Sequence, residues 1–443
     1  MLDVLDHHLR EPTGRGLAEA VSSAIRSGEI VEGNRLPPIR TVANHLGVSP
    51  TTVSAAWSML ARAGTLRTDG RRGTSVARTS SGPTRYRRAL GATQRFPLDL
   101  STGVPDPELL PDLTAALTSV SRQGGRTSYL DEPSLPGLVE VLRTDWPYDA
   151  AAFTVVDGAM DALQQIVSVH LRMGDVVLVE HPCFPPLLDL LESVGARVVG
   201  LRMDAAGVLP ADLAAHVSGS SALILQTRAQ NPTGVSMSAA RAEELARVLA
   251  STDVLVVEDD SAGATSRTEP ISLGRWVPDR TLHIRSFSKS HGPDLRLAAV
   301  SGPTDLVGAV NDRRFLGQGW SSRLLQSVLV HQLTHAEPRR QVEAARREYA
   351  DRRNRIVVAL REAGVPVPPT DGINLWLPVR DEVAAQIRLA GQGIGVAAGG
   401  PFMVLPDESP HLRVTVGLVT EEHERVAAEL AEAAGVGAWP GPR

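Results

Sequence analysis

Lysine is almost absent from this chain of 443 residues. Lysine and arginine total 45, and all but Lys289, in the stretch SFSKSHGPDLR, are arginine. A general preference of the source genome for arginine explains the scarcity without any function. The two side chains nevertheless differ chemically, because a guanidinium stays charged whereas a desolvated amine can lose its proton and form a Schiff base. Lys289 is therefore a candidate for covalent chemistry, although scarcity alone leaves both interpretations open.

Cysteine and long apolar runs are also scarce. The single cysteine, Cys183, excludes an intrachain disulfide framework and suits a reducing cytoplasm. No apolar run is long enough to span a bilayer, and the opening residues MLDVLDHHLREPTGRG do not form a signal peptide. With 42% apolar and 21% charged residues, the composition is that of a globular protein of two or three domains. The sequence predicts a cytoplasmic protein.

Positive charge is concentrated near the N-terminus. Residues 1–95 contain 14 arginines against 7 acidic residues, a formal charge of +7, whereas the whole chain carries −5. The remainder therefore sums to −12, since −5 − 7 = −12. A basic module on an acidic body indicates a polyanionic partner for the first part, with a merely solvated basic surface as the alternative.

The basic region has the pattern of a winged helix-turn-helix. Apolar periodicity predicts helices over residues 17–30 and 39–46, and a third helix from Ser49 in SPTTVSAAWSMLARAG. The run LRTDGRRGTSV predicts a hairpin with glycine and arginine at its tip. Small polar side chains at the start of the third helix suit base edges, while arginines suit phosphates. The pattern therefore favours double-stranded DNA as the partner.

Residues 14–78 resemble the GntR family of bacterial regulators through RLPPIR, LGVSPTTV and the wing GRRG, where the family usually has Gly-Arg-Gly. The resemblance implies that a set of residues lies at the DNA surface: Arg35, Arg40, Ser49, Thr51, Thr52 and Gly73. Two wing arginines, Arg71 and Arg72, are long enough to reach an adjacent groove or phosphate. A protein-binding or oligomerisation module is the alternative for this head.

A change of composition marks the expected domain boundary. The stretch RTSSGPTRYRRALGATQR is rich in Ser, Gly, Pro and Arg and has no apolar period, which is typical of a mobile basic linker. We expect a winged helix-turn-helix over residues 1–78, a linker over 79–96 and an effector domain with large and small subdomains over 97–443.

From about Phe96, apolar runs alternate with helical stretches. The runs VVLVE, ALILQ, VLVVE and TLHIRSFS predict an α/β fold with a mainly parallel sheet covered on both faces. Ligands of such sheets bind beyond the C-terminal ends of the strands. Asp259 and Asp260 follow VLVVE, Asn231 follows ALILQT, and Lys289 follows HIRSFS, so we expect these side chains to lie close together.

The residues at these strand ends match the needs of pyridoxal phosphate. That cofactor requires a lysine, a carboxylate at the ring nitrogen, a donor to the ring hydroxyl, a stacked aromatic ring, and amides, hydroxyls and an arginine around the phosphate. The candidates, in that order, are Lys289; Asp259; Asn231; Phe184; and Gly158, Ala159, Met160, Ser286, Ser288 and Arg296. Strand alternation also permits Glu258 and Asp260 to point inward instead of Asp259, and Phe184 could be plain core.

Residues 97–435 resemble the fold-type I aminotransferases of class I, with matches at 286–296, 230–234, 157–163, 179–184 and 412–417. Joined to the GntR-like head, the whole chain resembles the MocR group of regulators. The resemblance implies that Lys289 forms the internal aldimine, that Asp259 pairs with the pyridinium, and that Arg413 holds the carboxylate of an amino-acid-like ligand. It further implies that Tyr129 reaches the cofactor phosphate of the partner subunit in a homodimer. A surface ion pair is the alternative for Arg413.

Three positions depart from the family pattern. Ser261 stands where the family usually has a tyrosine, Val156 and Asp157 precede Gly158 where Thr or Ser is usual, and Ser134 replaces a glycine. These changes argue against efficient turnover without abolishing cofactor binding. The sequence therefore favours a DNA-binding transcription regulator that binds pyridoxal phosphate, no metal, and senses the cofactor or an amino compound. The alternative is an active aminotransferase that carries a GntR-type head.

Overall fold

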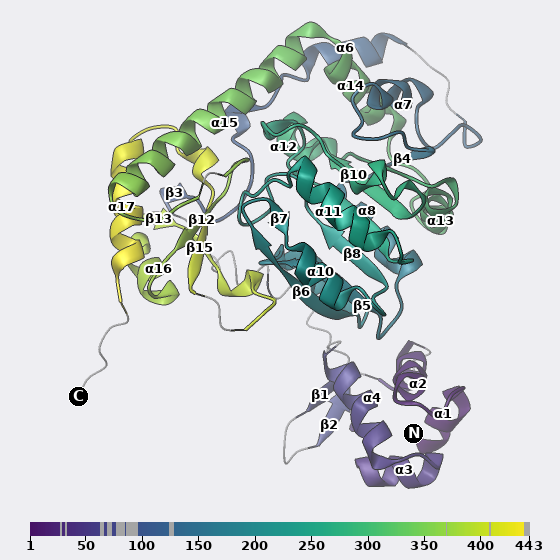
Figure 1. Ribbon diagram of the computed structural model, residues 1–443. Helices are drawn as coiled ribbons and strands as arrows, with labels where there is room; N and C mark the ends of the chain where they lie inside the picture. The colour runs from purple at the N-terminus through teal and green to yellow at the C-terminus, as the bar shows by residue number, and fades with distance from the viewer. Residues whose placement is uncertain are drawn as a thin grey trace.

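The computed structural model describes residues 1–26, 29–31, 33–62, 66–68, 73–76, 85, 96–123, 128–368, 370–406 and 409–437. A small helical head precedes a larger α/β body, as Figure 1 shows. None of the helices in these ranges combines the length and the apolar character that crossing a membrane requires.

Helices around one apolar core form the head. Its elements are α1 (Leu2–His8), α2 (Gly14–Arg26), α3 (Ile39–Leu46), α4 (Pro50–Arg62), β1 (Leu66–Thr68) and β2 (Thr74–Val76). Val53, Trp57 and Leu60 fall on one face of α4 and pack into the same cluster as Leu17 and Val21 of α2. Helix α3 begins and ends as expected, and α4 begins at Pro50 as expected. Helix α2 starts earlier than expected and ends four residues short of Ile30, and α1 was not expected.

The wing is an antiparallel hairpin in which Leu66 pairs with Val76. Arg35 adds an isolated antiparallel bridge to Ser75, so the segment before α3 is attached to the wing. The tip, including Arg71 and Arg72, lies outside the described residues.

The body is built on an eight-stranded sheet with the order β4-β11-β10-β9-β8-β5-β6-β7. Its strands are β4 (Ala152–Val156), β5 (Val176–His181), β6 (Arg197–Asp204), β7 (Gly207–Val208), β8 (Ala222–Leu225), β9 (Leu255–Asp260), β10 (Thr281–Ser286) and β11 (Ala298–Gly302). Strands β6, β5, β8, β9 and β10 run parallel, while β11 is antiparallel to both β10 and β4. The predicted α/β fold with a mainly parallel sheet is confirmed.

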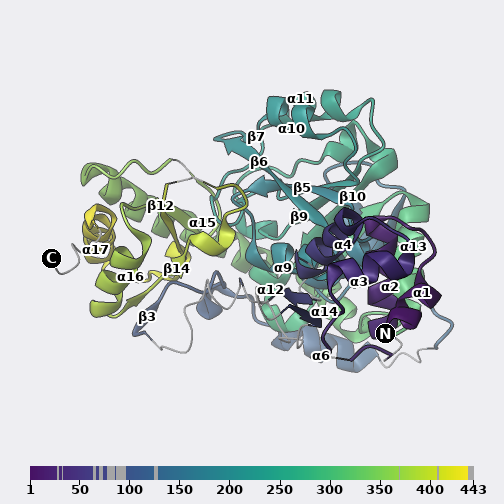
Figure 2. The ribbon, with the colours of Figure 1, turned by 90° about the horizontal axis from the view of Figure 1, so that it is seen from below.

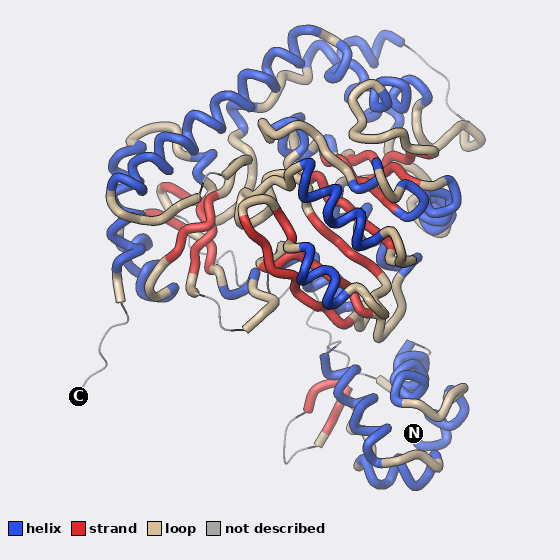
Figure 3. Tube along the Cα trace, viewed as in Figure 1, coloured by secondary structure: helices blue, strands red, loops and turns tan. Residues whose placement is uncertain are grey.

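Successive residues of the central strands supply two different cores, because side chains alternate across a sheet. Val177 and Val179 of β5 join the cluster that includes α8 (Ala159–His170), α9 (Pro185–Ser193) and α13 (Thr304–Phe315). Leu178 joins the opposite cluster with α10 (Pro210–His216) and α11 (Ala239–Leu249). The red strands between blue helices in Figure 3 follow this layered arrangement. Burial on both faces explains why the strands read as continuous apolar runs.

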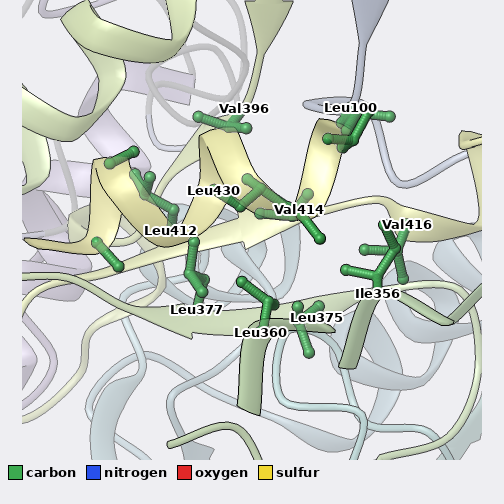
Figure 4. Close-up of a cluster of buried hydrophobic side chains, with 14 of the residues drawn as sticks. Leu100, Ile356, Leu360, Leu375, Leu377, Val396, Leu412, Val414, Val416 and Leu430 are labelled. Carbon is green, nitrogen blue, oxygen red and sulfur yellow. The ribbon is translucent and has the colours of Figure 1, made fainter. Parts of the chain in front are cut away.

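A 27-residue helix, α15 (Ala336–Glu362), leads from the body to a C-terminal unit. That unit contains β12 (Leu375–Pro378), α16 (Glu382–Gly391), β13 (Ile394–Gly395), β14 (Ala397–Ala398), β15 (His411–Val414) and α17 (His423–Gly435). Leu360, Leu412 and Leu430 belong to its buried cluster, shown in Figure 4. Strand β3 (Leu98–Asp99) pairs with β13, so the start of the body is anchored in the C-terminal unit.

Further helices complete the body: α6 (Thr114–Gln123), α7 (Pro136–Arg143), α12 (Ser288–His291) and α14 (Arg323–Thr334). Figures 1 and 2 both place the C-terminal unit on the side of the sheet away from the head.

Of the expected linker over 79–96, the structure describes Arg85 and Phe96. Arg85 contacts α9, and Met173 of the body packs against the apolar core of the head.

Candidate functional site

Lys289 and Asp259 come from adjacent parallel strands. Strand β10 leads directly into α12, which carries Lys289, and Ile284 of β10 pairs with Asp259 of β9. Burial lowers the pKa of Lys289 below the usual lysine range, although the carboxylate of Asp259 acts in the opposite direction. Strand β9 continues through Asp260, so the two aspartates end the strand rather than following it as expected. The site has a lysine whose amine is easier to deprotonate than in water.

Alternation along β9 separates its three consecutive acidic residues. Glu258 accepts hydrogen bonds from Ser272 Oγ at 2.5 Å and from the Leu273 amide, and its Oε2 lies 2.8 Å from His283 Nδ1. Asp260 forms a buried pair with Arg228, with Nη2 2.5 Å from Oδ2. Both carboxylates are thereby engaged by neighbouring protein groups. Asp259 lies between them and, by strand alternation, points to the other face of the sheet, where its charge acts on Lys289 more strongly than that of Asp260.

Gln226, at the end of β8, connects two of the predicted site residues and was missed by sequence reasoning. Its Nε2 donates to Asp259 Oδ2 at 2.8 Å, and its Oε1 accepts from the amide of Asn231 at 2.7 Å. Burial raises the pKa of Asp259, and the hydrogen bonds from Ser261 and Gln226 oppose that rise. A polar residue directly after a buried strand was the available signal for Gln226.

Asn231 has an amide group that fits a ligand atom. Its side chain is buried, and Oδ1 finds no hydrogen-bond partner among the residues that the structure describes. Buried polar atoms in proteins nearly always have a partner, so an additional group is expected next to Asn231. The Asn231–Pro232 peptide bond is cis. Phe184, at the N-terminus of α9, is half-buried. Part of its side chain packs against the apolar core, as the alternative interpretation expects, and the rest is accessible.

The predicted phosphate cradle lies at the N-terminus of α8. Gly158 caps this helix with φ 98°, and a side chain there would begin 3.0 Å from the Arg296 guanidinium. Arg296 Nη2 donates to the Asp157 carbonyl at 2.9 Å. The free amides at this helix start, including those of Ala159 and Met160, and the adjacent guanidinium form an arrangement suited to a phosphate.

The hydroxyls expected in the cradle lie at the end of β10, which β11 separates from β4. Sheet register aligns Val156 of β4 with Ala298 of β11, and Ala298 with Ser286 of β10. Ser286 Oγ accepts a hydrogen bond from the amide of Ser288 at 3.3 Å. Ser286 and Ser288 therefore lie two strands away from the turn that contains Gly158, with β11 between them.

Arg413 approaches the lysine from the C-terminal unit. It is buried on β15, so the surface ion-pair interpretation is wrong, and its Nη2 donates to the carbonyl of Ser101. Gly103, with φ 70°, lets the chain pass so close to the guanidinium that any Cβ there would collide with it. The charge of Arg413 contributes to the lowered pKa of Lys289, after the larger effect of burial. Lys289, Asp259 and Arg413 thus lie within electrostatic range of one another.

Tyr129 lies on the surface of the chain. It is 87% exposed, and its ring lies edge-on to Trp320 with centroids 5.5 Å apart. The other predicted cofactor residues gather at the strand ends, whereas Tyr129 does not join them within one chain. A role for Tyr129 in the site requires a second copy of the protein.

The three departures from the family pattern each have a local contact. Ser261 Oγ donates to Asp259 Oδ1 at 2.5 Å, so the serine holds the carboxylate. Asp157 accepts from Arg314 Nη2 at 2.7 Å. Ser134 Oγ accepts from the Val155 amide at 2.9 Å. These residues stabilise the walls of the site. In the described ranges, no three His, Cys, Asp or Glu side chains are placed to hold a metal ion.

Glu180, a further buried carboxyl beneath the site, gives a pH prediction. Burial raises its pKa to about 8 from an ordinary value of 4.5. The folded state then holds a proton that the unfolded state releases, so folding stability falls as pH rises from 4.5 toward 8. The loss approaches roughly 1.4 kcal/mol per pH unit. Glu180→Gln should remove this loss, which urea unfolding at several pH values would measure.

An exposed glutamate on α7, Glu140, supplies the matched control. Glu140→Gln should follow the wild-type pH dependence. Parallel loss of stability in the wild type and in Glu180→Gln between pH 5 and 8 would contradict the assignment of that proton to Glu180.

The structure describes six of the eight residues that the sequence predicts to face DNA. Arg35, Arg40 and Thr51 are exposed, as is Gly73, which has φ 84° in the wing. Ser49 Oγ accepts from the Thr52 amide at 3.0 Å and lies 2.8 Å from the Thr52 hydroxyl. The Ser49 hydroxyl therefore caps α4 and engages the Thr52 hydroxyl, while Thr51 and Ser54 are exposed.

Comparison with known proteins is consistent with this arrangement. A model for class I and II aminotransferases matches residues 97–430, and one for bacterial regulatory proteins of the gntR family matches residues 13–76. The vitamin B6 salvage pathway transcriptional repressor PtsJ of Salmonella typhimurium is 34% identical over 95% of this chain and 98% of its own. The HTH-type transcriptional regulator TauR of Rhodobacter capsulatus is 26% identical over 88% of this chain and 90% of its own.

Solved structures show the same body fold. The multiple substrate aminotransferase from Thermococcus profundus has a TM-score of 0.70 at 21% identity and covers 81% of this chain and 95% of its own. The aspartate aminotransferase of Thermus thermophilus, with maleate, has a TM-score of 0.66 at 24% identity, covering 76% of this chain and 91% of its own.

The class defined by this fold and site is a DNA-binding transcriptional regulator with an aminotransferase-like domain, whose family cofactor is pyridoxal phosphate. The chain belongs to the class I and II aminotransferase family, and its GntR-type head makes it a MocR-type regulator.

Proposed function

We propose that this regulator binds pyridoxal phosphate on Lys289 and that the bound cofactor changes its affinity for DNA. The observation that carries the proposal is that Lys289, half-buried on α12, lies within electrostatic range of the buried side chains of Asp259 and Arg413. Pyridoxal phosphate supplies an aldehyde that a neutral amine can bond and an aromatic ring that withdraws electrons. Lys289, with its lowered pKa, is suited to hold that aldehyde.

The remaining contacts would orient the group. Asp259, fixed by Gln226 and Ser261, would hold a proton on the ring nitrogen. The side-chain amide of Asn231, whose Oδ1 has no partner among the described residues, would meet the ring hydroxyl, and Phe184 would cover the ring. The start of α8, Arg296, Ser286 and Ser288 would bind the phosphate.

Helix α9 offers a physical connection to the head. Phe184 is its N-cap, and the Arg85 amide donates to Asp189 Oδ2 at 3.1 Å near the middle of that helix. Arg85 Nη2 also pairs with Glu192 Oε1 at 2.6 Å. A ligand against Phe184 can favour one position of α9 only by binding that arrangement more tightly. The contact with Arg85 would carry this preference to the segment that joins the head.

DNA binding with and without cofactor tests the proposal. Duplexes selected from a random library by the full-length protein would be titrated by fluorescence anisotropy, with and without pyridoxal phosphate. We expect a change in Kd of about tenfold, within the usual range of allosteric coupling. Arg85→Ala should retain DNA binding but reduce this response, while Arg425→Ala, on the exposed face of α17, should not. Equal affinity in both states would exclude cofactor sensing.

An amino compound is a second candidate signal, because Arg413 is a buried cation suited to bind a carboxylate bidentately. In this case the cofactor-loaded protein would respond to added amino acids, and Arg413→Leu would not.

Turnover as an aminotransferase is the enzymatic alternative, since Lys289, Asp259 and Arg413 would serve that reaction as well. Ser261 in place of the usual tyrosine argues against it. Sustained conversion of an amino donor and a keto acid to new products would favour the enzyme.

The domain limits and the assembly belong to the same proposal. We assign DNA recognition to residues 1–78, a linker to 79–96 and sensing to 97–443. A homodimer would bring Tyr129 of one subunit to the site of the other. The naming of a related regulator after vitamin B6 salvage suggests genes of vitamin B6 supply as targets. Analytical ultracentrifugation and the sequences of the selected duplexes test these assignments.

A further inference from the structure

A cavity separate from the Lys289 site opens between α7, α14, α15 and the end of β10. Its volume is about 730 Å³, and it adjoins a second cavity of about 410 Å³. Both are lined by Arg285, Phe287, His291 and Arg346. The larger is lined by none of the residues proposed for the cofactor, whereas the smaller also reaches Ser286. Helix α12 carries both Lys289 and His291, so it borders the cofactor site and the cavity.

The cavity is positively charged on an otherwise acidic body. The larger cavity is lined by five arginines, Arg285, Arg339, Arg340, Arg346 and Arg347, against two acidic residues, Asp145 and Glu343. Its formal charge is +3 (5 − 2), while residues after 95 sum to −12. Burial lowers the pKa of His291 to about 4, so this histidine adds no charge near neutral pH. A concave surface of one sign concentrates ions of the opposite sign.

Two buried polar atoms in the wall lack a hydrogen-bond partner among the described residues, and two exposed arginines lack an ion pair. Arg285 is buried and pairs with Asp145 at 2.7 Å, yet its Nε has no hydrogen-bond partner in the part of the chain that the structure describes. The same is true of Oε1 of Gln332, which is fully buried. Arg339 and Arg347 are exposed and form no ion pair with any described residue. These donors and this acceptor are available to a ligand.

The opposite part of the wall is apolar. Leu142 of α7, Phe287, Leu333 of α14 and Val342 of α15 line the same space. A bare inorganic ion would leave this surface exposed to water, whereas an organic group would cover it. The combination of arginines and apolar side chains is typical of a site for an anion that carries a hydrocarbon body.

We propose that this cavity is a second ligand site, which binds a small organic anion through Arg339, Arg347 and Arg285 and packs its apolar part against Leu142 and Leu333. A carboxylate and a phosphate ester share the recognition chemistry, because a guanidinium can donate two parallel hydrogen bonds to either. The proposal does not depend on the cofactor being held by Lys289.

Calorimetric titration of the full-length protein tests the site. The probes are phenyl phosphate, benzoate and inorganic phosphate. We expect phenyl phosphate, benzoate or both to bind with one site per chain and more tightly than inorganic phosphate. Binding should weaken at least tenfold in the double variant Arg339→Gln/Arg347→Gln, since two charge-assisted contacts are removed. Both positions are exposed, so the variant should fold normally.

Two further variants separate the cavity from other anion sites. Arg355→Gln lies about two turns beyond Arg347 on the exposed face of α15 and should leave binding unchanged. Arg296→Gln alters the proposed cofactor cradle and should also leave binding unchanged. Binding that is lost in Arg296→Gln but kept in the double variant would overturn the proposal, as would failure of both organic probes to bind. Equal affinity for inorganic phosphate would overturn the assignment of an organic ligand.

Discussion

Replacing Lys289 with arginine is expected to abolish covalent capture of pyridoxal phosphate. The substitution keeps the positive charge and most of the length of the side chain, but a guanidinium does not form the bond with the aldehyde that an amine forms. Wild-type protein treated with the cofactor and borohydride should carry one pyridoxyl group, on Lys289. The variant should carry none at a side chain, because the chain has no other lysine. Peptide mass spectrometry reads this outcome directly.

A second lysine placed elsewhere controls for nonspecific labelling. Arg361→Lys adds an amine on the exposed end of α15. If Lys289 reacts because its amine is desolvated and lies in a built site, the amine introduced by Arg361→Lys should remain unlabelled at stoichiometric cofactor. Comparable labelling at both positions would mean that pyridoxal phosphate reacts with any lysine amine of this protein. The labelling of Lys289 would then no longer support a cofactor site.

Local patterns in the sequence were sufficient where neighbouring residues determine the structure. Helix α3 forms over Ile39–Leu46 as its periodicity predicts, and Gly47 ends it with φ 65°. The buried strands could likewise be predicted from continuous apolar runs, because burial on both faces of the sheet is visible in neighbouring residues. Helix α2 ends early, at Arg26, and Ile30 reaches the apolar core from the segment after the helix. Apolar spacing alone could not distinguish these two ways of burying Ile30.

Contacts between distant segments were beyond such patterns. The sequence left Glu258, Asp259 and Asp260 as alternatives. In the structure Glu258 and Asp260 meet His283 and Arg228, whereas Asp259 is the carboxylate with the largest effect on Lys289. The sequence did not reveal Gln226, because its role depends on hydrogen bonds to two separate segments, to Asp259 on β9 and to Asn231 in the loop after β8. Strand register, set by packing of the whole sheet, brings such residues together.

Removing two arginines from the head should weaken DNA binding strongly and in a salt-dependent manner. Arg40 is exposed in the first turn of α3, and Arg35 is exposed where its backbone bridges to Ser75 of the wing. We expect both side chains to contact phosphates on either side of α4. Each phosphate contact contributes about 0.9 to the slope of log K against log salt. Arg35→Ala/Arg40→Ala should therefore flatten that slope by about 1.8 and lower affinity roughly 30-fold near physiological salt. Anisotropy titrations over a range of salt concentrations measure both quantities.

Arg15→Ala is the matched control, because Arg15 is an arginine of the head that pairs with Glu19 on α2. It should leave the slope unchanged. Thr51→Ala should instead change preference among duplexes at nearly constant slope, since a side chain that reads base edges releases no counterions. A slope unaffected by Arg35→Ala/Arg40→Ala would mean that these residues do not touch phosphates. The basic charge of the head would then favour a solvated surface or an oligomerisation module, and the site around Lys289 would have to act through another partner.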